Sequence, residues 1–147
     1  MCPEMMKTLL LVAVLLGIGG LLSFVVMAAI SRKGSAPGLV DGRLAPLPET
    51  PNAHLATFPI PEGTDGKAAI QSALGQLPGT RVVAETGPYL AAESRTGLFG
   101  FVDDVEVLID EAAGELHVRS ASRMGHSDLG ANEKRVARLR ELFEATQ

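Results

Sequence analysis

The sequence is poor in cysteine and in aromatic residues. Among 147 residues there is one cysteine, one tyrosine and no tryptophan. A single cysteine excludes an intrachain disulfide, a Cys-x-x-Cys redox pair and a zinc knuckle. This residue, Cys2, precedes the long apolar run instead of following it, so it does not fit a lipidated cysteine. The aromatic content of 4% predicts a core built mostly from aliphatic side chains.

The chain also lacks an excess of positive charge. Its formal net charge is −4, and the first 33 residues carry +2, which leaves −6 on the other 114. A nucleic-acid-binding domain is normally basic, because it must neutralise phosphates. We therefore expect no nucleic-acid partner.

One long apolar run stands near the amino terminus. Thr8 to Ile30 is a 23-residue stretch without a charge. As a helix rising about 1.5 Å per residue it crosses the roughly 30 Å hydrocarbon core of a bilayer. It ends in Met27-Ala28-Ala29, a poor small-x-small cleavage site, and it exceeds the usual signal-peptide core of about 7 to 15 residues. The run predicts an uncleaved transmembrane anchor over residues 1–33.

Small side chains recur along this predicted helix at a spacing of four. Such spacing lets a neighbouring membrane helix approach closely, although glycine is also frequent in membrane helices generally. The candidate helix-contact residues are Ala13, Gly17, Gly19, Gly20 and Ser23. The expected partners are integral membrane proteins, reached through this helix, and the lipid bilayer.

The orientation of the anchor is open at this point. Arg32, Lys33 and Arg43 follow the span, whereas Lys7 precedes it. Positive residues tend to stay in the cytoplasm, which favours a cytoplasmic domain. A short tail with one lysine ahead of an apolar core is typical of an export signal-anchor, which favours the opposite side.

A proline-rich segment follows the anchor. Six of the nine prolines fall between Pro37 and Pro61, so we expect neither a regular helix nor a central strand there. We interpret residues 34–62 as a tether and residues 63–147 as a compact domain.

Periodic patterns return in the compact domain. The patterns predict helices over 67–77 and 132–145, strands over 80–86 and 89–96, and a hairpin around residues 111–114. The predicted fold class is α+β: one N-terminal transmembrane helix, then a four-stranded antiparallel sheet with two helices.

The hairpin has a defined register. Pairing Asp110 with Glu115 closes a four-residue loop. The same register places Ile109 opposite Leu116, Val107 opposite Val118, His117 opposite Leu108, and Glu106 opposite Arg119. One face of the hairpin is therefore expected to be core and the other charged.

Three carboxylates stand at the start of this hairpin. Asp103, Asp104 and Glu106 offer the oxygen ligands that hard cations prefer. Strand alternation sends Asp103 to one face and the other two to the opposite face, so they are weak metal candidates. In the alternative interpretation, Glu106 pairs with Arg119 while Asp103 or Asp104 fixes the preceding turn. We expect no metal and no cofactor.

A second polar cluster follows the hairpin. Arg119 and Arg123 share one strand face, and Ser127 leads into a helix N-terminus, which favours an anion. The candidate ligand-binding residues are Arg119, Ser120, Ser122, Arg123, His126, Ser127, Asp128 and Asn132. The stronger interpretation is structural: the two strand serines satisfy backbone groups, and Asp128 or Asn132 caps the last helix.

Catalytic residues are not indicated. His126, Ser127 and Asp128 are adjacent, but members of a catalytic triad normally converge from separate segments beside an oxyanion hole. A hydrolase using Asp103, Asp104, His126 and Asp128 is the weakest hypothesis.

Several short motifs bear a family resemblance. They are Gly42-Arg43-Leu44-Ala45-Pro46, Pro51-Asn52, Tyr89-Leu90-Ala91-Ala92-Glu93, Phe99-Gly100-Phe101-Val102-Asp103-Asp104-Val105-Glu106, Val118-Arg119-Ser120-Ala121-Ser122-Arg123, and Ser127-Asp128-Leu129-Gly130 continuing to Asn132 and Arg135. Through them the chain resembles domain-of-unknown-function family 1499, over residues 39–142. The resemblance implies a short-anchored or exported protein without an assigned activity.

The chain departs from this family at one motif. The family usually has Cys-Pro-x-x-Pro-Asn-Cys, and the two cysteine positions here are Leu47 and Ala53. The resemblance implies a lost tether disulfide of an oxidising compartment, with Leu47 packing in its place. This favours the periplasmic side of a bacterial inner membrane.

These observations support one leading function and one alternative. The leading hypothesis is a non-enzymatic, single-pass accessory or assembly subunit of a larger membrane complex, such as an energy-converting one. The alternative is a membrane-tethered module that binds an anionic small molecule or a lipid headgroup through Arg119, Arg123 and Ser127.

Overall fold

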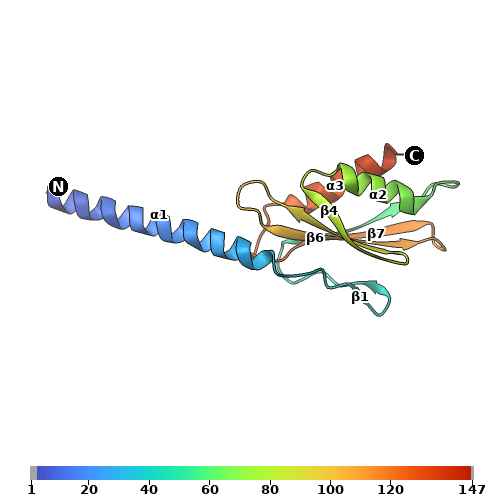
Figure 1. The fold of residues 1–147 in the computed structure, drawn as a ribbon, viewed down its shortest axis with the longest axis horizontal. Coiled ribbons are helices and arrows are strands. Elements are labelled where there is room, and N and C mark those ends of the chain that lie inside the picture. Colours follow the sequence, from blue (N-terminus) through green and yellow to red (C-terminus); the bar gives the residue numbers. More distant parts are fainter. Residues whose placement is uncertain (1–2, 147) are drawn as a thin grey trace.

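The structure, a computed structural model, describes residues 3–146. The predictions made for Cys2 lie outside these residues. A long helix leads into an α+β domain, and the two chain ends lie at opposite ends of the molecule (Figure 1). The predicted fold class is therefore correct at this level.

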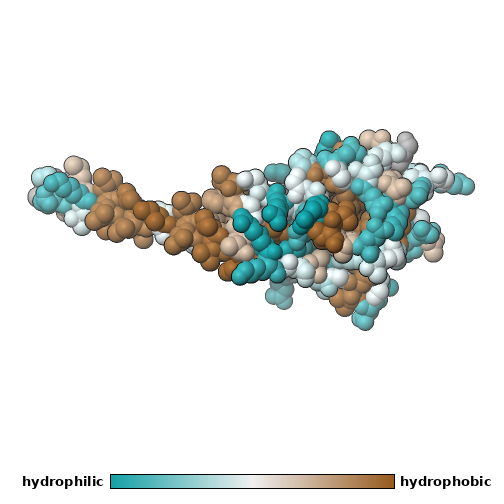
Figure 2. Space-filling model, in the orientation of Figure 1, coloured by the Kyte–Doolittle hydropathy of each residue, from teal (hydrophilic) through white to brown (hydrophobic). Residues whose placement is uncertain are grey.

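Helix α1 (Pro3–Ser31) contains the apolar run. It is long and apolar enough to cross a membrane, and its most apolar stretch is unburied. Figure 2 shows an almost continuous hydrophobic surface along it up to the domain. Buried residues on α1 are confined to its last turn, at Ala28 and Ser31.

The domain is built on a five-stranded antiparallel sheet in the order β3-β7-β6-β5-β4. Its strands are β3 (Ala53–Pro59), β4 (Thr80–Thr86), β5 (Tyr89–Arg95), β6 (Val102–Asp110) and β7 (Glu115–Ser122). The prediction of four strands is wrong by one. The missing strand is β3, which pairs with β7 along the edge of the sheet.

Strand β3 comes from the proline-rich segment expected to be a tether. An edge strand tolerates proline because its outer N–H groups need no ladder partner. Here Pro59 ends the strand, and Phe58 is buried in the core. Burying Phe58 thus stabilises a strand in a segment whose proline content disfavours regular structure.

The same segment also forms a small hairpin, β1 (Leu39–Val40) with β2 (Arg43–Leu44). Its two turn residues, Asp41 and Gly42, both have positive φ, as the tightest hairpin turns require. The hairpin lies on the side of the sheet away from α2 and α3 (Figure 1), where β2 contacts β6 and β7.

The expected packing of Leu47 is wrong. This side chain is 43% exposed. It lies between the small hairpin and β3, where the chain runs along the surface without regular structure.

The predicted register of the β6–β7 hairpin is confirmed at every pair. Asp110 lies opposite Glu115, Ile109 opposite Leu116, Leu108 opposite His117, Val107 opposite Val118, and Glu106 opposite Arg119. The alternation fixes this register because a slip of one residue would turn the apolar side chains to water.

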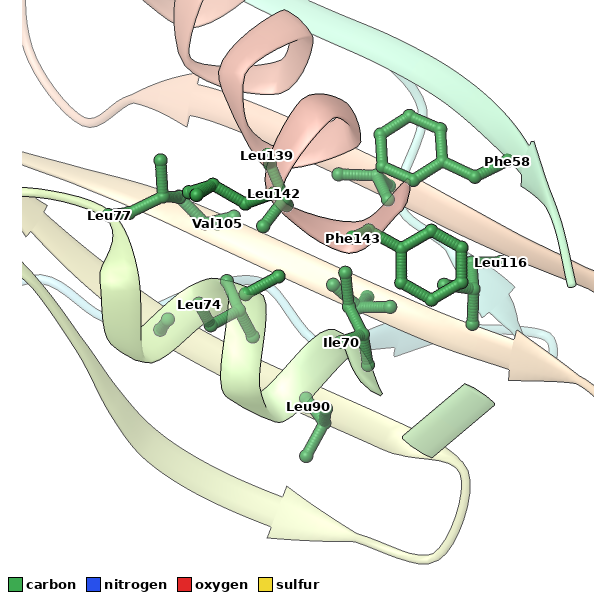
Figure 3. Close-up of a cluster of buried hydrophobic side chains, with 14 of the residues drawn as sticks. Phe58, Ile70, Leu74, Leu77, Leu90, Val105, Leu116, Leu139, Leu142 and Phe143 are labelled. Carbon is green, nitrogen blue, oxygen red and sulfur yellow. The ribbon is translucent and has the colours of Figure 1, made fainter. Parts of the chain in front are cut away.

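Helices α2 (Gly66–Gln76) and α3 (Ala131–Glu144) cover one face of the sheet. Asp65 caps α2 by accepting a hydrogen bond from the Ala68 N–H at 2.9 Å. Between helices and sheet lies a mainly aliphatic core, with Phe58 and Phe143 as its aromatic members (Figure 3). The opposite face of β5, β6 and β7, away from these helices, carries polar side chains.

Candidate functional site

Charged residues gather on the sheet face that points away from α2 and α3. They stand on β5, β6 and β7 and just beyond, because alternate residues of these strands share that face. We call this group the charged face: Tyr89, Glu93, Asp104, Glu106, Arg119 and Arg123.

Glu106 is the centre of the charged face and is fully buried. Its Oε2 accepts a hydrogen bond from Arg119 Nη1 at 2.7 Å. Its Oε1 accepts from the Tyr89 hydroxyl at 2.7 Å and from the backbone N–H of Gly38 at 3.0 Å. The Gly38 contact ties the segment after α1 to the sheet. Burial, together with the bond to Glu106, raises the pKa of Tyr89 well above its ordinary value.

Arg123 links three separate parts of the chain. Its Nη2 donates to Asp104 Oδ1 at 2.6 Å and to Glu93 Oε1 at 3.0 Å. Its Nη1 donates to the backbone carbonyl of Ser31, at the end of α1, at 3.0 Å. The hydrogen bond to Asp104 raises the pKa of Arg123 above its ordinary value, although burial opposes this.

The partners of Glu93 extend this network to the edge of the sheet. Arg81 Nη2 lies 3.2 Å from Glu93 Oε2. Burial alone would raise the pKa of Glu93, but the hydrogen bonds from Arg123 and Arg81 outweigh it and lower the pKa. The carboxylates and guanidinium groups of the charged face therefore neutralise one another.

One nitrogen of the charged face is not satisfied. Arg119 Nε is buried and has no hydrogen-bond partner within residues 3–146. Leaving such a group unpaired costs about 1–3 kcal/mol. The Arg119–Glu106 pair is therefore less favourable than a fully bonded one.

A second polar cluster lies on the helix side of the sheet, centred on the buried side chain of Asn132. Its Nδ2 donates to the Asn52 carbonyl at 2.8 Å, to Ser122 Oγ at 2.9 Å and to Asp128 Oδ2 at 2.7 Å. Its Oδ1 accepts from Ser120 Oγ at 2.6 Å. These bonds fasten the start of α3 to β7 and to the chain entering β3.

The predicted ligand-binding residues are thus divided between two faces. Arg119 and Arg123 lie on the charged face, whereas Ser120, Ser122 and Asn132 lie on the helix side. His126 and Ser127 are exposed. The structure brings the two serines to Asn132 but does not bring them to the arginines.

Asp128 occupies the start of α3. Its carboxylate accepts hydrogen bonds from the N–H groups of Gly130 at 2.9 Å and Asn132 at 2.8 Å. Burial alone would raise the pKa of Asp128, but these bonds lower it. The N-cap residue is Gly130, which has no side chain to bond, so Asp128 caps the helix from two residues earlier, and its carboxylate already holds the Asn132 N–H that an anion would use.

The acidic residues at the start of β6 are split as alternation predicts. Asp103 pairs with Arg135 of α3 at 2.8 Å, on the helix side, and Asp104 pairs with Arg123 on the charged face. The expectation that one of them fixes the preceding turn is wrong, because both reach arginines distant in sequence. Within residues 3–146, no three metal-ligating acidic, histidine or cysteine side chains gather at one place.

A protein-family model matches most of this chain. The family described as "Protein of unknown function (DUF1499)" matches residues 29–143. The chain belongs to this family. Among curated proteins, none matches the chain.

The DUF1499 match begins at residue 29 and so includes the last turn of α1. That turn is bonded into the domain: Ser31 Oγ accepts from the Val102 N–H at 3.0 Å. Arg32 donates from Nε to the Gly100 carbonyl at 3.1 Å and from Nη2 to the Phe99 carbonyl at 2.9 Å. Gly100 has a φ of +67°, and a Cβ there would lie 2.7 Å from Arg32 Nη2, so a larger residue would be strained and would displace this guanidinium.

Aromatic rings complete this junction between α1 and loop 96–101 of the DUF1499 domain. Phe24 stacks on Phe99 with ring centroids 5.4 Å apart, and Phe101 meets both rings edge-on. A hollow of about 180 Å³ beside them is lined by Phe24, Met27 and residues of the segment before α3. The sequence patterns did not predict this junction, although three of the five phenylalanines gather here.

Proposed function

We propose that the protein is a non-enzymatic, single-pass membrane accessory or assembly subunit. In this proposal α1 crosses the membrane and associates with integral membrane proteins, while the DUF1499 domain stands on the aqueous side. The larger assembly would be a membrane complex, such as an energy-converting one.

The pairing of the charged face carries this proposal. Asp104, Glu106, Arg119 and Arg123 are buried or nearly so, and their charges are neutralised within the chain. A catalytic or anion-binding site needs a charged group free to meet its ligand. The pairing therefore favours a scaffold over the alternative of a module that binds an anion through Arg119 and Arg123.

The surface of α1 supports a role in helix association. Gly17, Gly19 and Gly20 have open space around the position of a Cβ, so no contact within residues 3–146 requires a glycine there. Glycine costs a helix about 1 kcal/mol relative to alanine. Close approach by another membrane helix would account for this cost.

Two separate faces of α1 carry the small residues. At 100° per residue, Ala13, Gly17 and Gly20 share the face of Phe24 and Ser31, on which the domain packs. Gly19 and Ser23 lie roughly 120° around the helix from that face. A partner helix on the first face meets loop 96–101, whereas one on the second passes beside the domain.

The contacts of the last turn also support an uncleaved anchor. Cleavage after Ala29 would remove Phe24 and leave Phe99 without its stacking partner. Arg32 donates to two backbone carbonyls of the domain, so the positive charge after the span has a structural role and need not indicate a cytoplasmic orientation. We therefore keep the bacterial inner membrane with a periplasmic domain as the proposed location.

The test is a mild-detergent purification of the intact chain from its native membrane, followed by mass spectrometry and cryo-electron microscopy. The proposal expects a stoichiometric complex with integral membrane proteins. It also expects Gly17→Leu or Ser23→Leu to release the partner. The matched control is Ile18→Phe, which enlarges a side chain roughly 120° from either small-residue face. A wild-type chain that purifies as a lone monomer would refute the proposal.

A further inference from the structure

We propose that loop 96–101 is itself a membrane-seating element, which places Leu98 in lipid at the boundary between headgroups and hydrocarbon. This inference uses one part of the proposed function, that α1 crosses a membrane. It adds a second lipid contact, made by the folded domain.

The depth of Phe24 sets the depth of the loop. About 20 helical residues span the hydrocarbon core, and every 20-residue stretch within Thr8–Ile30 contains Phe24. Phe99 stacks on Phe24, and Phe101 packs against both rings. Wherever the span is placed along the apolar run, loop 96–101 therefore reaches the hydrocarbon boundary or lies below it.

The backbone on both sides of the loop's tip is hydrogen-bonded within the protein. Non-helical backbone is tolerated at membrane depth only when its polar groups find partners in the protein. Here the Thr96 and Gly100 N–H groups bond to the Phe101 and Thr96 carbonyls at 2.9 and 3.1 Å. The Phe101 N–H donates to Thr96 Oγ1 at 3.0 Å. Arg32 donates to the carbonyls of Phe99 and Gly100. Gly97 and Leu98, at the tip, make no backbone hydrogen bond within residues 3–146, which fits the headgroup boundary, where water and headgroups can bond these groups.

The side chain at the tip of the loop faces outward. Leu98 is 85% exposed, and Leu129, in the neighbouring segment before α3, is 89% exposed. A scattered exposed leucine is ordinary on a water-facing surface. These two leucines lie in the segments that border Phe24 and Met27 of α1, so in the proposed span they lie near the hydrocarbon boundary, where leucine is favoured.

Basic residues surround this end of the domain. Lys33 and Arg95 are exposed, as is Arg81, which also pairs with Glu93, and the two arginines lie near the ends of β4 and β5 that face α1. Each basic side chain near an anionic surface gains about 1 kcal/mol. An apolar loop tip with basic residues next to it suits the boundary of a bilayer, where the tip contacts hydrocarbon and the basic side chains contact headgroups.

The test uses the intact chain, reconstituted at one copy per lipid nanodisc. Because the chain has no tryptophan, each single-tryptophan variant reports one position. The variants are Leu98→Trp, Ala112→Trp in the exposed turn between β6 and β7, and Leu15→Trp in the middle of α1. Quenching by lipids brominated on their acyl chains measures contact with hydrocarbon.

The inference expects Leu98→Trp to emit at shorter wavelength than Ala112→Trp and to be quenched severalfold more strongly. Leu129→Trp is a second reporter on the same edge. If Leu15→Trp is quenched while Leu98→Trp behaves like Ala112→Trp, the seating of the loop is refuted and the membrane anchor stands. If Leu15→Trp is not quenched either, the anchor fails and the inference fails with it.

Discussion

Removing one partner of the Glu106–Arg119 pair should destabilise the domain, and replacing Glu106 should cost more than replacing Arg119. Glu106 accepts three hydrogen bonds, whereas Arg119 donates to one carboxylate and leaves its Nε unpaired. Breaking a buried ion pair by removing one partner costs about 3–5 kcal/mol.

The cost of Arg119→Met in unfolding free energy should lie at or below the lower end of that range. Glu106 keeps the donors from Tyr89 and Gly38, and the unpaired Nε, whose burial costs about 1–3 kcal/mol, is removed. We therefore expect Arg119→Met to lower the free energy of unfolding by about 2–3 kcal/mol. Glu106→Gln leaves a buried guanidinium without a carboxylate, and we expect the full cost of about 3–5 kcal/mol. The double variant should cost less than the sum of the two.

The assay is denaturant unfolding of the intact chain in detergent, followed by circular dichroism and by the fluorescence of Tyr89, the chain's one tyrosine. Arg138→Met is the matched control, because its ion pair with Glu141 is more than half exposed and should change stability by at most about 1 kcal/mol. The reasoning is wrong if Arg119→Met costs no more than this control, or costs more than Glu106→Gln.

Three further predictions concern other parts of the domain. Asn132→Ala should lower the free energy of unfolding by about 2–4 kcal/mol, since it removes several buried hydrogen bonds; the same unfolding assay measures it. The pKa of Tyr89 is raised on folding, so the stability it contributes is complete below pH 10 and falls as the pH rises through the folded-state pKa; ultraviolet titration should show ionisation only at strongly alkaline pH, and ionisation near pH 10 in the folded protein would contradict this. The pKa of Asp128 is lowered, so its contribution is present above about pH 4 and is lost on acidification, and Asp128→Asn should flatten the acid limb of the stability curve. Unfolding measured from pH 2 to 6 tests this, with Asp110→Asn as control.

The sequence predicted correctly those parts of the fold in which apolar and polar residues alternate over a few positions. The β6–β7 register followed from alternation around Ile109 and Leu116, and with it the pairing of Glu106 with Arg119. Strand β3 was missed because the prolines around it dominate the composition, although Phe58 is a core residue.

The rest of the site depends on contacts between distant segments. Arg123 lies beyond the end of β7, and its partner Glu93 becomes a neighbour only when β5 pairs with β6. The stacking of Phe24 on Phe99 joins residues that no local pattern relates. The predicted anion cluster grouped residues by proximity in sequence, and the pleat of β7 then sent them to opposite faces.

The bonds between the last turn of α1 and the domain have a mechanical consequence. Ser31 and Arg32 are bonded to β6 and to loop 96–101. Arg123, just after the end of β7, donates to the Ser31 carbonyl of the same turn. These bonds join helix and sheet directly, so in the proposed membrane orientation we expect them to rotate together about the membrane normal. Under the proposed function, a neighbouring helix that packs on one side of α1 would therefore also fix the orientation of the whole domain, and with it the surface that the domain presents to the rest of the assembly.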